Sequence, residues 1–220
     1  MTTRPSPTVH PRGAAAAKRP RGRPRKTPDE LDEGNRRRVV LDAAARLFRR
    51  KGYAATTTRD IAAAARMHAG SPFYHFKSKG ALLGAVMEAG MRAAIARQAG
   101  SRELDAEPVA ALRGLIRGHF DTLHGAGRDF IPVMLYEARS LSAKQRTTIA
   151  RLQREYESAW LPVLDALAAS GRLRCDVAIA RLLIFGALNW SVQWFDPKKT
   201  LSLDDLTDAA IAMFIHEELT

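Results

Sequence analysis

Hydroxyl, imidazole and cationic side chains gather in one short stretch, residues 57–79, with a spacing that suits contacts to a polyanion. Such groups hydrogen-bond phosphate oxygens, and small polar side chains can reach base edges in a DNA groove. The candidate phosphate contacts are Thr57, Thr58, Arg59, Lys77 and Lys79. The candidates for base edges or the adjacent backbone are His68, Gly70, Ser71, Tyr74 and His75. For Tyr74 and His75 the alternative is a packed pair of surface aromatic rings.

Two short helices are expected to position these groups. Thr57 and Asp60 have the spacing of a capping box, so a helix should begin there, and the alanines that follow favour it. Residues 66–68 interrupt the pattern, and a second short helix follows, with Phe73 and Phe76 to anchor it. Two short helices joined by a short turn form a helix-turn-helix, whose second helix reads the major groove.

The stretch 57–83 resembles the DNA-binding domain of the tetracycline-repressor (TetR) family. Residues 40–48, with Gly52 and Tyr53, fit that family's first helix and turn, so the resemblance covers residues 36–91. The sequence departs from the family pattern in three places. Arg66 stands where the family usually has a turn glycine, Pro72 where it usually has leucine, and Phe73 where tyrosine is frequent.

The resemblance implies an all-α fold, in which residues 35–80 would be a three-helix DNA-binding domain and residues 81–220 a helical domain for effector binding and dimerisation. Residues 1–34 are rich in Pro, Ala, Arg and Lys without apolar periodicity, so we expect them to be a disordered basic tail. It also implies a homodimeric repressor that a small molecule releases from a palindromic operator.

The excess of positive charge is confined to the first 98 residues of the chain. The formal net charge is +12, and residues 1–28 hold eight basic and no acidic side chains. Residues 29–98 hold thirteen basic and seven acidic side chains, whereas residues 99–220 are slightly acidic. A polyanion-binding half is therefore expected beside a nearly neutral half.

Within the tail, residues 18–26 resemble an AT-hook. Gly22 would let the backbone lie flat in a narrow minor groove while Arg21 and Arg23 extend along its floor, where the negative potential is enhanced. The alternative is a generic cationic tail that adds only phosphate affinity.

Helical patterns account for the remaining chain. We expect helices over residues 35–51, 78–98, 108–124, 128–139, 142–170, 176–195 and from Ser202 onward, the fifth kinked at Pro162. Ser142 with Gln145 and Ser202 with Asp205 have capping-box spacing. The segment 177–195 is apolar nearly all round, so it and the last helix are expected to form a four-helix dimer interface; the alternative is a large monomeric core.

The effector candidates follow from the family resemblance. Residues 186–195 and 201–205 look like a branch whose effectors are often acyl-CoA thioesters, with Arg113, Arg117 and Arg139 available for the phosphates. The alternative for each candidate is an ordinary place in the core or interface. The candidates are Arg113, Arg117, Phe120, Met134, Tyr136, Tyr156, Trp160, Asn189, Trp190 and Gln193.

Other classes of protein are poorly supported. The single cysteine, Cys175, has no histidine nearby in sequence, and no HExxH, CxxC or glycine-rich phosphate loop occurs, so we expect no enzyme activity, cofactor or metal site. The apolar segment 177–195 contains Arg181, Asn189 and Gln193 and fits a buried helix better than a membrane span.

We therefore expect a cytoplasmic regulator with double-stranded DNA, a second copy and a small molecule as partners. The rivals are an architectural DNA-binding protein without an effector, and an enzyme or transport-type binding protein.

Overall fold

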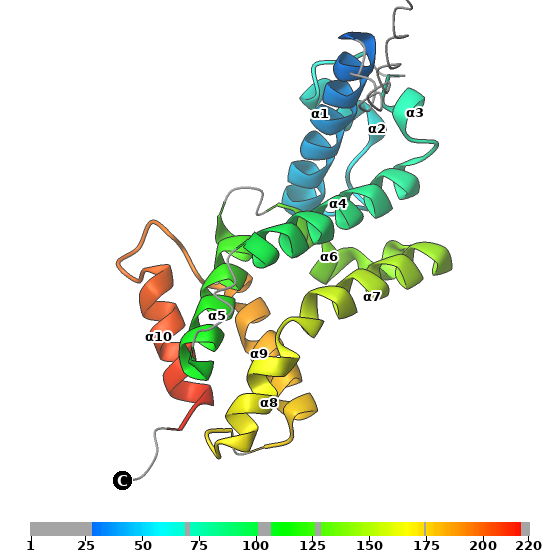
Figure 1. Cartoon of the computed structure of the whole chain (residues 1–220). Helices are drawn as coiled ribbons and strands as arrows, with labels where there is room; N and C mark the ends of the chain where they lie inside the picture. The colour runs from blue at the N-terminus through cyan, green and yellow to red at the C-terminus, as the bar shows by residue number, and fades with distance from the viewer. Residues whose placement is uncertain (1–27, 69–70, 101–106, 126–128, 174, 217–220) are drawn as a thin grey trace, which may run out of the picture.

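The computed structural model describes residues 28–68, 71–100, 107–125, 129–173 and 175–216. These residues form helices and no strands, as the sequence predicts (Figure 1). The helices are α1 (Pro28–Lys51), α2 (Thr58–Ala64), α3 (Ser71–His75), α4 (Lys79–Gly100), α5 (Pro108–His124), α6 (Phe130–Glu137), α7 (Ala143–Ser158), α8 (Leu161–Ala169), α9 (Val177–Trp190) and α10 (Leu203–Phe214). Two 3₁₀ turns, Ala138–Ser140 and Ser191–Gln193, follow α6 and α9.

Helices α1 to α3 form a small head at one end of the molecule (Figure 1). Its core is made of fully buried apolar side chains from all parts of the head, including Val40, Phe48 and Ile61. Phe76, directly after α3, is also buried, as predicted. Helix α1 ends at Gly52, whose φ of 79° is the left-handed conformation that favours glycine at a helix end.

Helix α1 begins at Pro28, earlier than the predicted start at Asn35. Proline suits the first turn of a helix because its missing N–H has no partner there. Residues 28–34, assigned to the tail from the sequence, are therefore part of α1. The tail residues before Pro28, including Arg21 and Arg23, lie outside the described residues.

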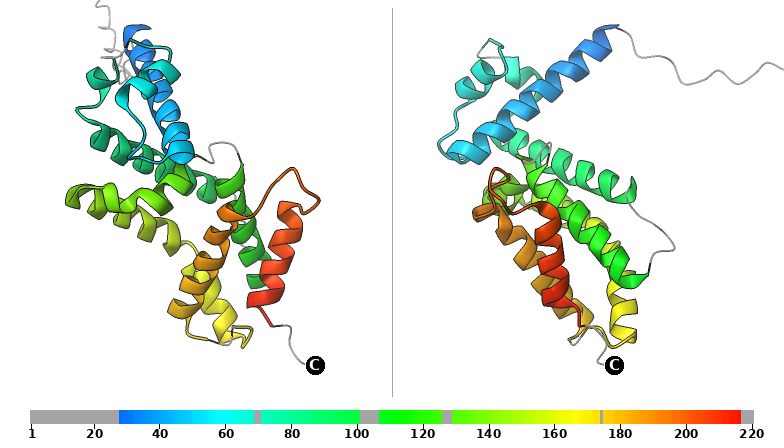
Figure 2. Two further views of the ribbon diagram at one scale, coloured as in Figure 1. Left: turned by 180° about the vertical axis from the view of Figure 1, so that it is seen from behind. Right: turned by 90° about the vertical axis from the view of Figure 1, so that its left-hand side faces the viewer.

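Helix α4 leaves the head and continues into the body, which α5 to α10 form (Figures 1 and 2). It packs against α1 on one side and against α5, α6 and α7 on the other. In the body, α10 lies beside α5 in both views of Figure 2, and α9 packs against α8 and α5. Because α4 belongs to both parts, head and body are joined by a continuous helix rather than by a flexible linker.

The three predicted capping boxes are present. Thr57 with Asp60, Ser142 with Gln145, and Ser202 with Asp205 each exchange reciprocal hydrogen bonds at the start of a helix. Hydrogen bonds from Thr57 hold the pKa of Asp60 below its ordinary value, and those from Ser202 do the same for the pKa of Asp205.

The predicted helix over residues 142–170 is two helices. α7 ends at Ser158 and α8 begins at Leu161, with Trp160 as the residue before it. Pro162 lies in the first turn of α8 and has no N–H to donate back to Ser158, so the helix stops and restarts instead of bending. The break turns α8 back against α9.

Helix α9 ends at Trp190, before the predicted end at Phe195, and a 3₁₀ turn follows. Its 14 residues span about 21 Å, shorter than the apolar layer of a bilayer. Across the described part of the chain, none of the helices is both long and apolar enough to cross a membrane.

Candidate nucleic-acid interface and ligand cavity

The turn between α2 and α3 is built on Arg66. Its φ of 57° is left-handed, and it is the one residue other than glycine with a positive φ in the described chain. The N–H of Met67 donates to Ala62 O at 2.9 Å and the N–H of Arg66 donates to Ala63 O at 3.0 Å, which is the Schellman pattern of a helix end. An arginine therefore occupies a conformation that glycine usually supplies.

The predicted DNA contacts in the head are mostly accessible. Arg59, His68 and Lys77 are exposed, and 79% of the Tyr74 surface is open. The Tyr74 ring meets His75 edge-on at 5.2 Å, so Tyr74 is both packed against its neighbour and free to contact a partner. Thr57 caps α2, Thr58 is half-buried in its first turn, and Ser71 begins α3. Gly70 lies outside the described residues.

Lys79 has a different role from the predicted phosphate contact. Its ammonium donates to the carbonyl oxygens of Tyr53 at 2.9 Å, Ala54 at 3.3 Å and Thr56 at 2.9 Å, and it lies 4.4 Å from the centre of the Tyr53 ring. Three carbonyls match the three donors of an ammonium group. Lys79 therefore holds the turn between α1 and α2 and has no donor left for a phosphate.

A small cavity lies in the body where α4, α5, α6, α7 and α9 meet. Its volume is about 70 Å³. Most of its wall is apolar, and the polar side chains that line it come from α5, α7 and α9. The lining residues are Met91, Ala94, His119, Thr122, Ile131, Met134, Leu135, Gln153, Tyr156, Glu157, Phe185 and Asn189.

A buried histidine organises the polar side of the cavity. His119 Nδ1 lies 3.0 Å from the Tyr156 hydroxyl, and Nε2 lies 3.2 Å from Asn189 Oδ1. Because the Asn189 oxygen can only accept, Nε2 carries the proton and the Tyr156 hydroxyl donates to Nδ1. Burial lowers the pKa of His119 from 6.5 to about 4, against the opposing effect of the bond to Asn189. The ring is therefore neutral at neutral pH, and burial also raises the pKa of Tyr156.

The charged residue in the cavity wall, Glu157, is already paired. Arg181 on α9 donates to its carboxylate, and about a quarter of each side chain is exposed, 24% for Arg181 and 27% for Glu157. Among the described residues, Gln153, one helical turn before Glu157, makes only a long contact of 3.9 Å from its amide nitrogen to the Met134 sulfur. Its amide is thus available to a ligand.

Helix α6 connects the cavity with the head. Ile131, Met134 and Leu135 line the cavity, while both ends of the helix bind the head. At its start Asp129 pairs with Arg49 at 2.8 Å, and at its end Glu137 Oε1 accepts from the Tyr53 N–H at 2.8 Å. A third tie runs from α7, where the Gln145 amide nitrogen donates to Gly80 O at 2.8 Å.

Three of the predicted effector residues, Met134, Tyr156 and Asn189, line the cavity. Phe120 and Trp160 are buried in the core instead, and in the amide orientation that satisfies both partners Gln98 accepts from the Trp160 indole N–H at 2.7 Å. The other aromatic and amide candidates lie on the surface. Tyr136 and Trp190 are more than half exposed, and the Gln193 amide donates to the Tyr136 hydroxyl.

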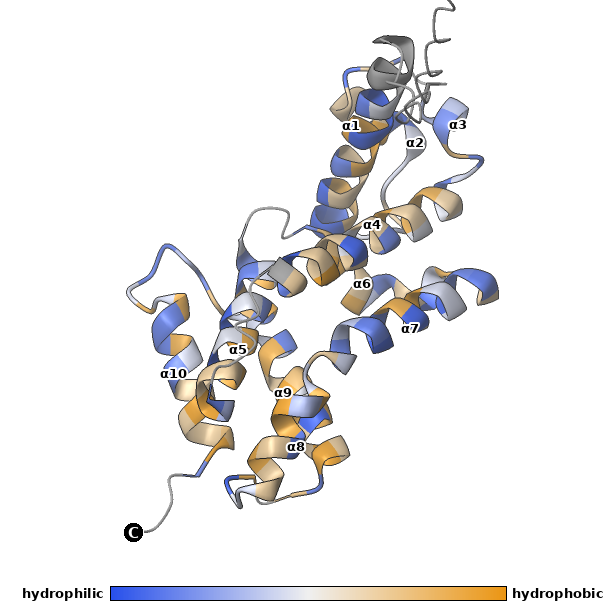
Figure 3. Cartoon of the chain, viewed as in Figure 1, coloured by the Kyte–Doolittle hydropathy of each residue, from blue (hydrophilic) through white to orange (hydrophobic). Residues whose placement is uncertain are grey.

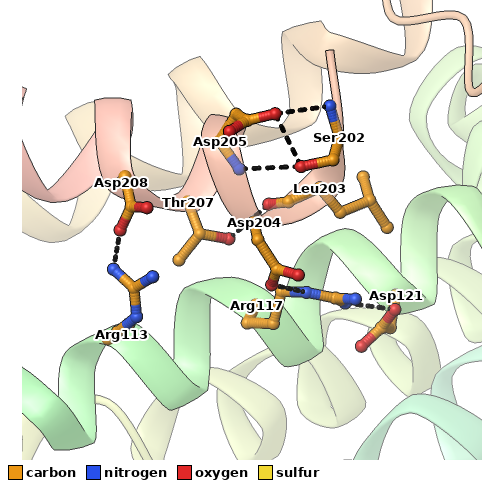
Figure 4. Close-up of polar contacts among 9 residues, drawn as sticks. All are labelled: Arg113, Arg117, Asp121, Ser202, Leu203, Asp204, Asp205, Thr207 and Asp208. Atoms are coloured by element: carbon orange, nitrogen blue, oxygen red, sulfur yellow. Dashed lines mark hydrogen bonds and ion pairs between the residues drawn. The ribbon is translucent and has the colours of Figure 1, made fainter. Parts of the chain in front are cut away.

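Arg113 and Arg117, predicted to meet ligand phosphates, instead fasten α10 to α5 (Figure 4). Arg113 pairs with Asp208, and Arg117 Nε donates to Asp204 at 2.7 Å while its NH1 group pairs with Asp121. Their charges are neutralised by acidic residues of α10 and α5, so neither is a cavity residue.

Sequence reasoning missed several cavity residues, above all His119, Gln153 and Phe185. A signal for His119 was present, because it falls on the apolar stripe of α5 beside Leu115, Ile116 and Leu123. A histidine on a buried stripe requires hydrogen-bond partners from other helices. Those partners, on α7 and α9, could not be identified from the sequence alone.

Comparison with known proteins agrees with this architecture. Residues 40–86 match the family model described as bacterial regulatory proteins of the tetR family, and residues 105–217 match a tetracyclin repressor-like C-terminal domain. The repressor KstR2 of Rhodococcus jostii is 28% identical over 195 residues, which cover 85% of this chain and 93% of that protein.

Two solved structures are similar over most of the chain. AibR, crystallised with isovaleryl coenzyme A and operator DNA, is 26% identical with a TM-score of 0.75, covering 81% of this chain and 97% of AibR. The superantigen PfiT is 37% identical with a TM-score of 0.69, covering 83% of this chain and 97% of PfiT. On the matches of both its head and its body, the chain belongs to the TetR family of bacterial regulatory proteins.

Proposed function

We propose that this TetR-family DNA-binding regulator is a homodimeric repressor, released from a palindromic operator when a small molecule occupies the cavity between α4, α5, α6, α7 and α9. The observation that carries the proposal is the position of α6, which lines the cavity with one face and hydrogen-bonds the head at both ends. A ligand that displaces α6 would displace the head with it.

Operator recognition is assigned to the exposed polar groups of α2, α3 and the residues after α3. Tyr74 and His75 are the candidates for base edges, with Arg59 and Lys77 for phosphates. The excess positive charge in residues 1–98 supports this assignment. Arg21 and Arg23 in the tail would add minor-groove or phosphate contacts beside the head.

The effector is proposed to be an acyl thioester. KstR2 and AibR are similar to this chain over most of its length, and AibR has been crystallised with isovaleryl coenzyme A. The mostly apolar cavity suits the acyl portion of such a molecule. Because Arg113 and Arg117 form ion pairs with α10, other cationic side chains would have to bind the phosphates of a coenzyme A moiety.

Dimerisation is assigned to the outer face of α9. Ile179, Leu182, Leu183 and Trp190 form one helical stripe, and between 53% and 63% of each is exposed in the single chain. Helix α9 is apolar over most of its length, as its orange colour in Figure 3 shows. An exposed apolar stripe on such a helix is normally buried against another surface. On the same face Gly186 leaves open space where a second helix could approach closely. Met213 on α10 is a further large apolar side chain with high exposure, 69%.

The proposal is tested by selecting bound fragments from genomic DNA and titrating the resulting complex with isovaleryl-CoA. We expect one palindromic site bound at least about a hundredfold more tightly than bulk DNA, and release when the thioester is added. Tyr74→Ala should weaken operator binding far more than nonspecific binding. Equal binding to all duplexes, with no effect of any acyl-CoA, would favour an architectural protein instead.

A further inference from the structure

We infer that the cavity seats an uncharged, short acyl group by its carbonyl oxygen and rejects the corresponding free carboxylate. The inference rests on the proposed function, because it specifies which effectors the cavity can distinguish.

The described residues that line the cavity include no lysine or arginine. Arg181, the cation beside Glu157, is paired with it, so a carboxylate entering the cavity there would meet a satisfied ion pair and not a free positive charge. Arg97 on α4 acts electrostatically on Tyr156, but its side chain is exposed and is not part of the cavity wall. His119 cannot substitute, since both of its ring nitrogens are already hydrogen-bonded. An unpaired carboxylate in such surroundings is strongly disfavoured relative to water.

Hydrogen-bond donors for a neutral acceptor are available on the polar side. Asn189 uses its oxygen for His119, and its amide nitrogen has no acceptor among the residues that the structure describes. Within the described part of the chain, Gln153 has only its long contact with the Met134 sulfur. An amide N–H from α7 and another from α9 thus line the space where a thioester, ketone or amide carbonyl could accept.

The volume limits the acyl chain. At about 70 Å³ the cavity is roughly half the size of one that binds a benzene ring, so we expect an acyl group of fewer than six carbon atoms. Met91 and Met134 in the wall can adapt to small differences in shape, because methionine side chains are flexible. A long unbranched chain would need a rearrangement of α4 and α6.

The test compares isovaleramide with isovalerate, two molecules of nearly the same shape that differ in charge at pH 7.5. Binding of each to the full-length protein is measured by calorimetry and by ligand-observed NMR, with isovaleryl-CoA as the third ligand. We expect the amide and the thioester to bind and isovalerate to bind at least tenfold more weakly. Octanoyl-CoA should bind more weakly than isovaleryl-CoA.

A gain-of-function variant tests the reason for the selectivity. Gln153→Lys would place a cation at the half-buried wall position, and we expect it to bind isovalerate at least tenfold better than the wild type does. Gln153→Leu, the matched variant without a charge, should bind neither the amide nor the acid better.

The outcomes separate the inference from the proposed function. Equal binding of isovalerate and isovaleramide to the wild type would overturn the inference, while release of the operator by isovaleryl-CoA would still support the proposed function. Binding of the amide alone, with no effect of any acyl-CoA on the operator complex, would support the inference and contradict the proposed effector class.

Discussion

At Arg66 the backbone holds a left-handed conformation that costs a residue with a β-carbon about 1–2 kcal/mol. The family resemblance pointed to this position, because glycine usually stands there, and the φ of 57° shows that the turn kept its geometry when the residue changed. The strained residue lies in the turn that fixes the orientation of α3 relative to α2, which is within the DNA-reading part of the molecule.

Arg66→Gly is expected to stabilise the head by about 1 kcal/mol, the left-handed cost less the greater entropy of glycine in the unfolded chain. For a chain of this size the thermal midpoint should rise by roughly 2–4 °C. The measurement is thermal unfolding followed by circular dichroism. Arg66→Ala is the control, because it removes the charged side chain but keeps the strain, and it should leave the midpoint nearly unchanged.

His119 should make stability depend on pH. Its pKa is about 4 in the folded protein and 6.5 when exposed, so between these values the unfolded chain binds more protons than the folded one. The free energy of unfolding should therefore be constant above pH 6.5 with respect to this group and fall by up to about 3 kcal/mol as the pH drops to 4.

Denaturant unfolding at a series of pH values checks this expectation. His119→Gln, which can keep hydrogen bonds to Tyr156 and Asn189 but does not titrate, should show a shallower loss of stability between pH 6.5 and 4. His68→Gln changes an exposed histidine and should keep the wild-type slope. Identical slopes for wild type and His119→Gln would mean that the buried ring does not govern this loss.

At the scale of helices, the features that local chemistry determines were predictable. The three capping boxes, the turn between α2 and α3 and the start of α5 at Pro108 each depend on residues a few positions apart. Pairings between distant elements were not predictable. Arg113 and Arg117 looked available to a ligand because Asp208 and Asp204, which pair with them, lie far along the chain on α10, and Lys79 looked like a phosphate contact because its acceptors are backbone carbonyls.

The bond from the Tyr53 N–H to Glu137 provides a test of α6 as the connection between cavity and head. Glu137→Ala removes a charge-assisted hydrogen bond of 2.8 Å that joins the two parts. If this bond transmits about 1 kcal/mol of coupling, the ratio of operator affinities without and with effector should fall roughly fivefold, while the affinity for the effector itself stays nearly the same.

Fluorescence anisotropy with labelled operator gives the two operator affinities, and calorimetry gives the effector affinity. Ser140→Ala changes an exposed side chain in the 3₁₀ turn directly after α6 and should leave the ratio unchanged. An unaltered ratio in Glu137→Ala would show that the coupling runs through other contacts, such as Arg49 with Asp129.

For the whole molecule, the separation of charge and of exposed apolar surface suggests a division of labour. The basic half carries the head, while the nearly neutral half presents the apolar stripe of α9 to solvent. The sequence predicted that the last two helices would share a dimer interface. In the structure α10 packs mainly against α5, and of the large exposed apolar side chains on the two helices, α10 supplies Met213 whereas α9 supplies Ile179, Leu182, Leu183 and Trp190.

Leu183→Glu should separate the two copies without unfolding either. Leu183 is 58% exposed in the single chain, so a charge there costs the folded monomer little, whereas two buried carboxylates facing each other across a two-fold axis would be strongly unfavourable. Sedimentation should show a monomer with unchanged helical circular dichroism. Operator affinity should fall by at least about a hundredfold, because one head then reads one half-site.

Ala150→Glu, on the exposed side of α7, is the control and should remain a dimer that binds the operator normally. A dimeric Leu183→Glu would place the interface elsewhere. A monomeric variant with full operator affinity would instead show that a single head suffices for recognition, and the requirement for two-fold symmetry would have to be abandoned even though α9 was the correct interface.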